Sequence, residues 1–306
     1  MKDYTLPIRL IHILSDGKVY SKIQLSCYMG ITCLEVINLI EMLKEWNIHI
    51  CVLDHEYYRF ACAMQLLNER KINQELLGGR LVVIPILNST NQYLLDAVSG
   101  LKSGDVCAAE YQRNGRGRHG AQWFSPFGSN LYFSMYWRLD QSLKAPAIGL
   151  SRLISIVIAK VLQQKGASDI RVKWPNDIYL YDRKLAGVLV EIKKNTENAL
   201  DVVIGAGINI SMKKLANSIF IKNSWIDLQE TGMSIDKNSL LVSIINTMYI
   251  ALKKFERQGM TMWYQSTVYM DNYINDLLAR IISDDKPNRM INQTTSNQSE
   301  KILLFY

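Results

Sequence analysis

The spacing of the apolar residues changes near residue 80, and this change limits the possible folds more than any other feature. Before residue 60 apolar residues recur mainly at helical spacing, whereas after residue 80 strand patterns alternate with helical ones. Residues 81–84 are a continuous apolar run, typical of a buried strand, and residues 131–139 alternate as in a half-buried strand. The chain of 306 residues is therefore predicted to join a small helical unit to a larger α/β domain.

The first sixty residues predict three helices followed by an extended segment. Helical spacing up to residue 14 ends at an Asp-Gly pair, a second helix ends at Gly30, and Thr32 can cap a longer third helix. Three helices with a tight turn, then an extended segment at 48–60, are typical of a winged helix-turn-helix. A plain three-helix docking module fits the same spacing equally well.

After residue 60 the sequence predicts a connecting helix and then strands and helices in alternation. The predicted elements are a helix over 61–80 ending at Gly78-Gly79, strands at 81–86, 131–139, 170–174, 185–192 and 201–210, a helix over 151–165 closed by Gly166, and an amphipathic helix over 237–258. Residues 284–301 have almost no apolar side chains and read as disordered or loosely packed. The predicted domains are residues 1–63, 64–270 and 271–306.

Several classes of protein are excluded by what the sequence lacks. No apolar run reaches about 18 residues, so no membrane span is expected, and the N-terminus has no apolar core of a secretory signal. The five cysteines are an odd number without a CxxC pair, which argues against a disulfide scaffold or zinc ribbon and favours a cytoplasmic location. HExxH and GxSxG are absent too, so neither catalytic zinc nor a hydrolase triad is supported.

The formal charge of +7 indicates a polyanionic partner, and its distribution refines that idea. Residues 1–60 hold six Lys/Arg against seven Asp/Glu, whereas residues 61–270 hold 25 against 16. Residues 271–306 hold four against five. The basic surplus therefore belongs to the middle of the chain and not to the unit that is similar to a DNA reader.

Residues 115–120 read GRGRHG, which formally matches the dinucleotide-binding pattern GxGxxG. We reject that reading because the pattern needs a helix directly afterwards, and QWFSPFG at 122–128 cannot begin one. Two interpretations remain. The segment is either an anion-binding loop, in which Arg116 and Arg118 add forked donors to the backbone N–H groups, or a mobile surface loop with incidental arginines.

Polar residues also gather where the predicted strands end. Asn176 and Asp177 follow the end of one strand, Lys184 begins the next, and Asn209 closes the segment Gly-Ala-Gly-Ile-Asn. Carboxylate and amide oxygens in such a place can hold Mg²⁺ beside a triphosphate, and the lysine can add a cation. Each piece alone fits a hairpin turn better, but three of them within one sheet favour a shared site.

Residues 88–91 read Asn-Ser-Thr-Asn after the strand at 81–86. Such a run most often caps a helix, here one through residues 93–95. The alternative is that its hydroxyl groups face a small polar ligand.

Together these segments resemble the biotin–protein ligases, specifically the bifunctional type that is also the biotin operon repressor. The matching segments are Ser89-Thr90-Asn91, GRGRHG at 115–120, WFSPFGSNLYFS at 123–134, KWPNDIYL at 173–180, DRKLAGVLVE at 182–191 and GAGINI at 205–210. The resemblance covers about residues 1–275. It implies a winged helix-turn-helix, a central mixed-sheet ligase domain related to class II aminoacyl-tRNA synthetases, and a C-terminal SH3-like domain.

The resemblance also implies a reaction, its substrates and its partners. Biotin and ATP form biotinyl-5′-adenylate with Mg²⁺ as cofactor, and the biotin then passes to a lysine of the biotin carboxyl carrier protein of acetyl-CoA carboxylase. Two chains are expected to pair through the central sheet as a homodimer, and operator DNA is a possible partner. The basic surplus then serves the phosphates, the biotin carboxylate and an acidic carrier surface.

Residue roles carried over from the family follow the matching motifs. The implied catalytic residues are Lys184, Arg116 and Arg118. The implied biotin-binding residues are Ser89, Thr90, Asn91, Gln112, Gly115, Arg116, Gly117, Arg118, Lys184, Gly187 and Gly205. The implied nucleotide-binding residues are Arg118, Trp123, Asn176, Asp177, Asn209 and Trp225, with Asp177 as the ligand of Mg²⁺.

The chain departs from the family in two places. The expected recognition helix has no Lys or Arg between Thr32 and Lys44 and carries Glu35, although DNA readers need donors and cations there. We therefore expect operator binding to be weak or lost. At the other end, the polar run and short tail of residues 271–306 do not make an SH3-like barrel, so that domain is expected to be truncated or degraded, with a possible loss of ATP affinity.

Three alternatives stay open at the level of the sequence. A lipoate or octanoyl ligase or transferase has the same catalytic fold, although KWPND with GRGR favours biotin. A DNA-binding regulator that senses a ligand without ligase activity is opposed by the intact Lys184 and the acidic N-terminal unit. An inactive, degenerate protein is the third, and the altered C-terminus is what supports it.

Overall fold

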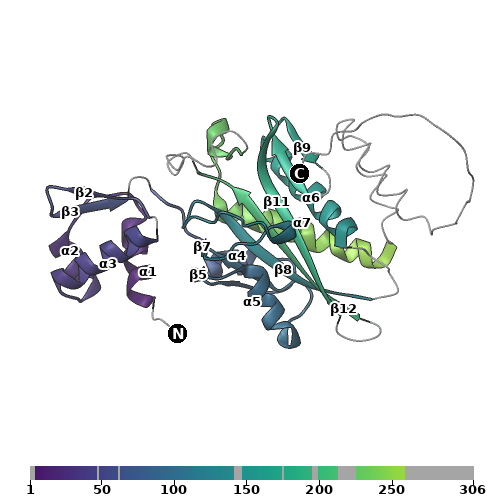
Figure 1. The fold of residues 1–306 in the computed structure, drawn as a ribbon, viewed down its shortest axis with the longest axis horizontal. Helices are drawn as coiled ribbons and strands as arrows, with labels where there is room; N and C mark the ends of the chain where they lie inside the picture. Colours follow the sequence, from purple (N-terminus) through teal and green to yellow (C-terminus); the bar gives the residue numbers. More distant parts are fainter. Residues whose placement is uncertain are drawn as a thin grey trace, which may run out of the picture.

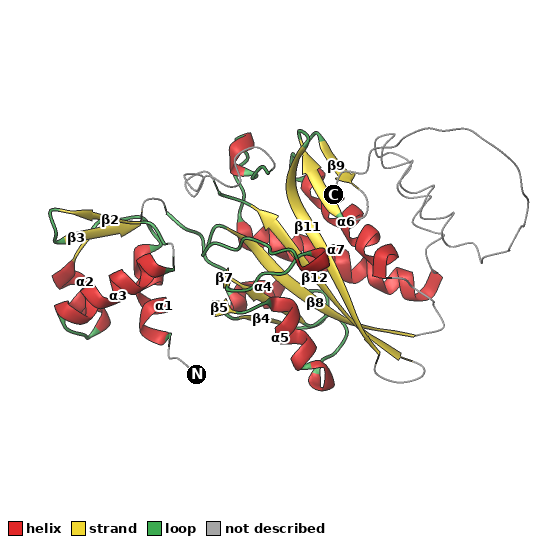
Figure 2. Cartoon of the chain, in the orientation of Figure 1, coloured by secondary structure: helices red, strands yellow, loops and turns green. Residues whose placement is uncertain are grey.

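The computed structural model describes residues 4–46, 48–60, 63–140, 147–173, 176–194, 199–212 and 225–258. In these ranges a small N-terminal unit (residues 4–60) lies beside a larger domain built on one mixed sheet, as Figures 1 and 2 show. The predictions for residues 271–306, including the SH3-like segment, lie outside the described residues.

The N-terminal unit has the three helices that the spacing predicts. Ser21 and Thr32 each form a capping box at the start of a helix, and Gly30 ends the second helix in the left-handed region, with φ of 68°. The extended segment is a hairpin whose second strand also pairs with a short strand before the second helix. The elements are α1 (Thr5–Leu14), β1 (Tyr20–Ser21), α2 (Lys22–Met29), α3 (Cys33–Glu45), β2 (Ile50–Leu53) and β3 (Tyr57–Phe60), with sheet order β1-β3-β2.

No single helix in the described part of the chain is long and apolar enough to cross a membrane. The pair α2–α3 reaches that length together, but with a bend of 99° between its members.

The larger domain is built on a seven-stranded sheet in which the edge strand β4 is parallel to its neighbour β6 and the other neighbours are antiparallel. Its order is β4 (Leu81–Val83), β6 (Val106–Ala109), β8 (Asn130–Asp140), β12 (Ala199–Asn209), β11 (Arg183–Lys194), β10 (Asp177–Leu180) and β9 (Ile170–Lys173). The remaining helices and strands are α4 (Glu69–Glu75), β5 (Ile86–Leu87), α5 (Thr90–Asp96), β7 (Tyr111–Gln112), α6 (Ala147–Gln164) and α7 (Lys237–Gln258), and β5 pairs with β7 in parallel.

The two faces of the sheet have different cover, and this difference positions the site. The long helices α6 and α7 pack on one face and form the main core with it (Figure 1). The short helix α5 covers only part of the other face, where Leu94 packs on Tyr136 and Val203. The rest of that second face is left for a cavity.

The prediction of a half-buried strand at 131–139 is wrong for most of its length. Tyr132, Ser134 and Tyr136 on the second face are at most 2% exposed, because α5 and the loop before β8 cover them. Their polar atoms are satisfied inside: the hydroxyl of Tyr136, for example, donates to Asp201 at 2.6 Å. The polar residues that alternate with apolar ones in this strand therefore form hydrogen bonds inside the protein and do not face water.

Two other predicted elements change their bounds. The connecting helix is limited to α4, because residues 65, 66 and 68 form hydrogen bonds with residues 237 and 238 at the start of α7 instead of helical ones. Asp177 does not lie in an open loop but begins β10, which returns antiparallel to β9. The predicted strands at 185–192 and 201–210, and the long helices around 151–165 and 237–258, are confirmed as β11, β12, α6 and α7.

The core of the N-terminal unit extends into the larger domain. Phe127, which is 4% exposed, belongs to the same apolar cluster as the buried side chains of α1 to α3. Tyr111 and Ile86 pack against that cluster too. Residues 111 and 127 lie on either side of the GRGRHG segment, so both ends of that segment are anchored near the N-terminal unit.

Candidate active site

A cavity of about 240 Å³ lies between α5, the GRGRHG segment and strands β10 to β12. From here on, residues 115–122 are called the glycine loop. The cavity is lined by most of the predicted site residues: Ser89, Thr90, Asn91, Gln112, Arg116, Gly117, Arg118, Trp123, Asn176, Asp177, Lys184, Gly187 and Gly205. Further lining residues, which are not among the predicted site residues, are Ala121, Gln122, Val188, Leu189, Ala206 and Gly207.

The β10–β11 hairpin places a carboxylate and a cation side by side at the cavity. Nζ of Lys184, near the start of β11, lies 2.9 Å from Oδ2 of Asp177 at the start of β10. The same Nζ lies 5.5 Å from the ring centre of Trp123, within the range of a cation–π contact. Lys184 is therefore held in place by two neighbours while a third of its side chain stays accessible to a ligand.

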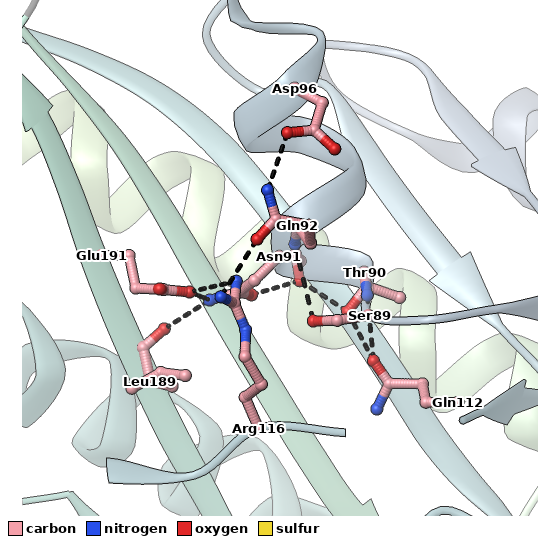
Figure 3. A network of polar contacts seen from close by, with 10 residues as sticks. Ser89, Thr90, Asn91, Gln92, Asp96, Gln112, Arg116, Leu189 and Glu191 are labelled. Carbon is pink, nitrogen blue, oxygen red and sulfur yellow. Dashed lines mark hydrogen bonds and ion pairs between the residues drawn. The ribbon is translucent and has the colours of Figure 1, made fainter. Parts of the chain in front are cut away.

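The two arginines of the glycine loop reach opposite walls. Arg116 donates to Glu191 on β11 at 2.9 Å and to Gln92 on α5 at 3.1 Å (Figure 3). Arg118 donates to Oδ1 of Asn176 at 3.2 Å. With Lys184, three cationic groups therefore meet at one cavity, and each is paired with an oxygen that an anionic ligand can replace.

A polar corner lies at the N-terminus of α5. Ser89 caps this helix, as predicted, by accepting from the backbone N–H of Gln92. The side-chain oxygen Oε1 of Gln112 accepts from both the backbone N–H and the hydroxyl of Thr90, at 2.9 and 3.2 Å. The buried hydroxyl of Ser134 lies 2.7 Å from Oγ1 of Thr90 and donates to Asn91 at 2.5 Å. Capping and ligand contact are thus compatible, since the corner offers both donors and acceptors to the cavity.

Glycines on β12 give the cavity its depth. A Cβ on Gly205 would lie 2.1 Å from Oδ1 of Asn91, and one on Gly207 would lie 2.4 Å from the indole of Trp123. Both glycines face α5 and the loop, so only residues without a side chain allow Asn91 and Trp123 to lie against the sheet.

Three buried donors in this region have no hydrogen-bond partner among the described residues: Nε of Arg116 and the indole Nε1 of Trp123 and of Trp225. Buried N–H groups without a partner are rare in proteins, and a polar ligand is one way to satisfy them. The arrangement therefore favours a ligand that carries several acceptor oxygens or nitrogens.

Three predicted site residues do not line the cavity but support it. The carbonyl of Gly115 accepts from the N–H of Trp123 and closes the base of the glycine loop. Asn209 donates to the carbonyl of Ile226 at 3.1 Å, and Trp225 bridges to Lys184. Gly115, Asn209 and Trp225 therefore hold the loop and the start of β11 in place, and their predicted ligand contacts stay predictions.

The residues present fit a magnesium ion only in part. Asp177 and the side-chain oxygen of Asn176 lie at the cavity, but no group of three or more His, Cys, Asp or Glu side chains comes together in the described ranges. Mg²⁺ commonly binds through one or two carboxylates together with substrate phosphates and water. Asp177 therefore fits a metal that arrives with a nucleotide, and does not fit a preformed metal site.

The sequence missed Glu191, Gln92 and Ser134, which contact predicted site residues directly. Glu191 closes the segment KLAGVLVE, and strand alternation from Gly187 through Leu189 places it on the cavity side of β11. That alternation was the available signal for Glu191. Ser134 lies opposite Gly205 in the pairing of β8 and β12, which no local pattern reveals.

Comparison with known proteins agrees with this geometry. Residues 83–209 match the model of the biotin/lipoate A/B protein ligase family. The chain is 46% identical to the bifunctional ligase/repressor BirA of Escherichia coli K12, over 93% of this chain and 88% of that protein. It is 26% identical to BirA of Bacillus subtilis over 79% of this chain and 76% of that protein.

A solved structure is similar as well. The biotin protein ligase of Aquifex aeolicus in complex with biotin and ATP superposes with a TM-score of 0.53 and 26% identity, covering 61% of this chain and 75% of that one. The matched region of the family model contains Ser89, the glycine loop, Lys184 and Asn209. The chain therefore belongs to the biotin–protein ligases of the biotin/lipoate A/B protein ligase family.

Proposed function

We propose that this chain activates biotin with ATP and transfers it to a lysine of a biotin carboxyl carrier protein. The observation that carries the proposal is the meeting of Lys184, Arg116 and Arg118 at one cavity whose far end is the polar corner of Thr90 and Gln112. A relative named as a ligase and repressor is 46% identical over nearly the whole chain, and a similar structure holds biotin and ATP.

The first step joins two anions, so it needs positive charge at the point of contact. A carboxylate oxygen of biotin attacks the α-phosphorus of ATP, and the bond to the β-phosphate oxygen breaks to release pyrophosphate. Lys184 is suited to lie between the carboxylate and the α-phosphate, because its Nζ is held by Asp177 and Trp123 at the wall of the cavity. Mg²⁺ held by Asp177 and the phosphates would supply further screening of the phosphate charge.

The second step needs the activated intermediate to wait for its acceptor. The carrier lysine attacks the acyl carbon, the bond from that carbon to the phosphate oxygen breaks, and AMP leaves while the amine loses a proton. Water would compete for the same acyl carbon, so the cavity has to exclude it. The glycine loop lies over the cavity in a position to do this, with Arg116 and Arg118 tied to the walls.

The test is ATP-dependent transfer of labelled biotin to a carrier domain by the purified chain, with labelled lipoate in a parallel reaction. We expect biotin on the carrier lysine and no transfer of lipoate. Transfer of lipoate in place of biotin would support the alternative ligase, and transfer of neither would refute the ligase function.

The polar corner provides a specific prediction for the biotin end of the cavity. Replacing Gly205 with alanine is expected to displace Asn91, because the new Cβ would lie 2.1 Å from its Oδ1. Overpacking of this kind costs about 1–3 kcal/mol, so biotin affinity measured by titration calorimetry is expected to fall roughly tenfold or more. Gly100→Ala is the matched control, since nothing lies within 4 Å of its Cβ. Equal affinities in the two variants would contradict the placement of the biotin site.

We further propose that the N-terminal unit is a winged helix-turn-helix whose operator binding is weak or lost. Three helices and a three-stranded antiparallel sheet, whose first strand lies between the first two helices, support the fold, and relatives are named as repressors. The exposed side of α3 carries Leu34, Ile37 and Glu35, of which Leu34 is 66% exposed, instead of the cations that phosphate contacts need.

This proposal predicts the outcome of a DNA-binding measurement. With biotin and ATP present, we expect no sequence-specific shift of a biotin-operon operator at nanomolar protein, in a gel or fluorescence anisotropy assay. A scrambled DNA of equal length is the control, and equal weak binding to both is expected. Nanomolar binding that prefers the operator would refute the proposal.

The homodimer that the family implies stays a proposal to be tested by the mass of the chain in solution with both substrates.

A further inference from the structure

The tip of the glycine loop is largely self-contained and is tied to the sheet by its arginines. Arg116 pairs with Gln122 across the loop, and the N–H of Gly117 donates to Ala121 at 2.7 Å. These contacts hold the loop in shape but do not fix it to the domain. Fixation comes from Arg118, which reaches Asn176, and from Arg116, which reaches Glu191 and Gln92.

The loop also separates two cavities. Its residues 116–118, 121 and 122 line both the cavity at Lys184 and a second, larger cavity on the outer side, of about 580 Å³. Glu191 lines the outer cavity, whereas Gln112 and Lys184 line the inner one. The ion pair between Arg116 and Glu191 therefore spans the wall between the inner cavity and the more open space.

Glu191 also contacts the polar corner. Its Oε2 accepts from Nδ2 of Asn91 at 2.7 Å as well as from Arg116 at 2.9 Å (Figure 3). Oδ1 of the same Asn91 accepts from Ser134 and lies against Gly205. One carboxylate oxygen thus joins the loop on one side to the wall of the inner cavity on the other.

From these contacts we propose that Glu191 is a positioning residue that latches the glycine loop through Arg116 and so sets how long the activated acyl intermediate stays in the cavity. The inference rests on the proposed ligase function and adds a residue to it. Without the negative charge, Arg116 is held by neutral amide oxygens in place of a carboxylate, and the loop opens more often. Adenylation is expected to persist in Glu191→Gln, because Lys184 is held by Asp177 and Trp123 and the glutamine keeps a side-chain oxygen that can accept from Arg116 or Asn91.

The first test uses the chain without substrates. In Glu191→Gln, trypsin cleavage after Arg116 and Arg118, mapped by mass spectrometry, is expected to be about fivefold faster than in the wild type, in line with the loss of a partly exposed ion pair. Glu230→Gln is the matched control. It removes an ion pair between Glu230 and Arg183, 2.7 Å apart, whose side chains lie outside the cavity and are about as exposed as those of Arg116 and Glu191. Equal rates of loop cleavage in all three proteins would overturn the latch.

The second test follows pyrophosphate release with biotin and ATP but no carrier. The wild type is expected to give one burst per active site and then a slow phase limited by escape or hydrolysis of the intermediate. In Glu191→Gln the burst is expected to keep its amplitude while the slow phase becomes about fivefold faster, and Glu230→Gln is expected to behave as the wild type.

The outcomes separate the two proposals. An unchanged slow phase in Glu191→Gln, or a lost burst in that variant alone, would overturn the role of Glu191 and leave the ligase function standing. A wild type without any burst would overturn the ligase function and, with it, the effect on the intermediate. In that case the trypsin experiment still decides whether Glu191 holds the loop.

Discussion

Replacing Lys184 with alanine is expected to slow formation of the adenylate by about tenfold to a hundredfold. The upper figure is the loss in rate that follows removal of one preorganised donor at a developing charge. The lysine lines the cavity, with Asp177 at 2.9 Å and the ring of Trp123 at 5.5 Å from its Nζ. Its removal leaves the carboxylate of biotin and the α-phosphate to approach each other without a shared positive charge.

The measurement for Lys184→Ala is the burst of pyrophosphate in the presence of biotin and ATP. Lys193→Ala is the matched control, since Lys193 is an exposed lysine on the same strand, β11, outside the cavity. We expect the control to keep the wild-type rate. An undiminished burst in Lys184→Ala would mean that the anions are brought together by the arginines alone, and the assignment of Lys184 would be wrong.

Local signals in the sequence predicted the parts of this site that depend on neighbours in the chain. Ser89 caps α5 because the backbone N–H of Gln92 is three residues away, and a capping residue before an apolar stretch marks that start. Lys184 could be placed near the beginning of β11 because the apolar run that predicts the strand follows it directly. The order of the GRGR, KWPND and KLAG motifs then indicated that these pieces meet.

Contacts between distant segments were not predictable by such signals. Glu191 and Arg116 are 75 residues apart in the sequence. Their pairing requires the glycine loop to lie over the face of the sheet from which the side chain of Glu191 projects. The same holds for the burial of the second face of β8, since the polar side chains of Ser134 and Tyr136 looked solvent-exposed until their partners Asn91 and Asp201 were in place. Sheet order and register carry this information, and a single strand pattern does not.

A buried ion pair between Glu110 and Lys237 gives the largest expected effect on stability. Both side chains are 4% exposed, with Nζ of Lys237 at 3.1 Å from Glu110 and at 2.9 Å from the carbonyl of Gly128. The other oxygen of Glu110 accepts from the N–H of Leu67 at 2.5 Å, in the segment that leads out of the N-terminal unit. The pair therefore joins three segments: the start of α7, the approach to the glycine loop and the connection between the two parts of the chain.

Replacing Lys237 with methionine is expected to lower the free energy of unfolding by about 3–5 kcal/mol, because it leaves the carboxylate of Glu110 buried without its counter-charge. In a thermal melt followed by circular dichroism this corresponds to a midpoint lower by roughly 10 °C. The double variant Glu110→Gln with Lys237→Met is expected to regain part of the loss, since no buried charge remains. Lys44→Met is the control for an exposed pair, with Glu41 at 2.7 Å, and is expected to change stability by less than about 1 kcal/mol. If Lys237→Met had the same melting midpoint as Lys44→Met, the ion pair between Glu110 and Lys237 would be solvated in solution. The junction between the N-terminal unit and the larger domain would then be held by its apolar contacts alone.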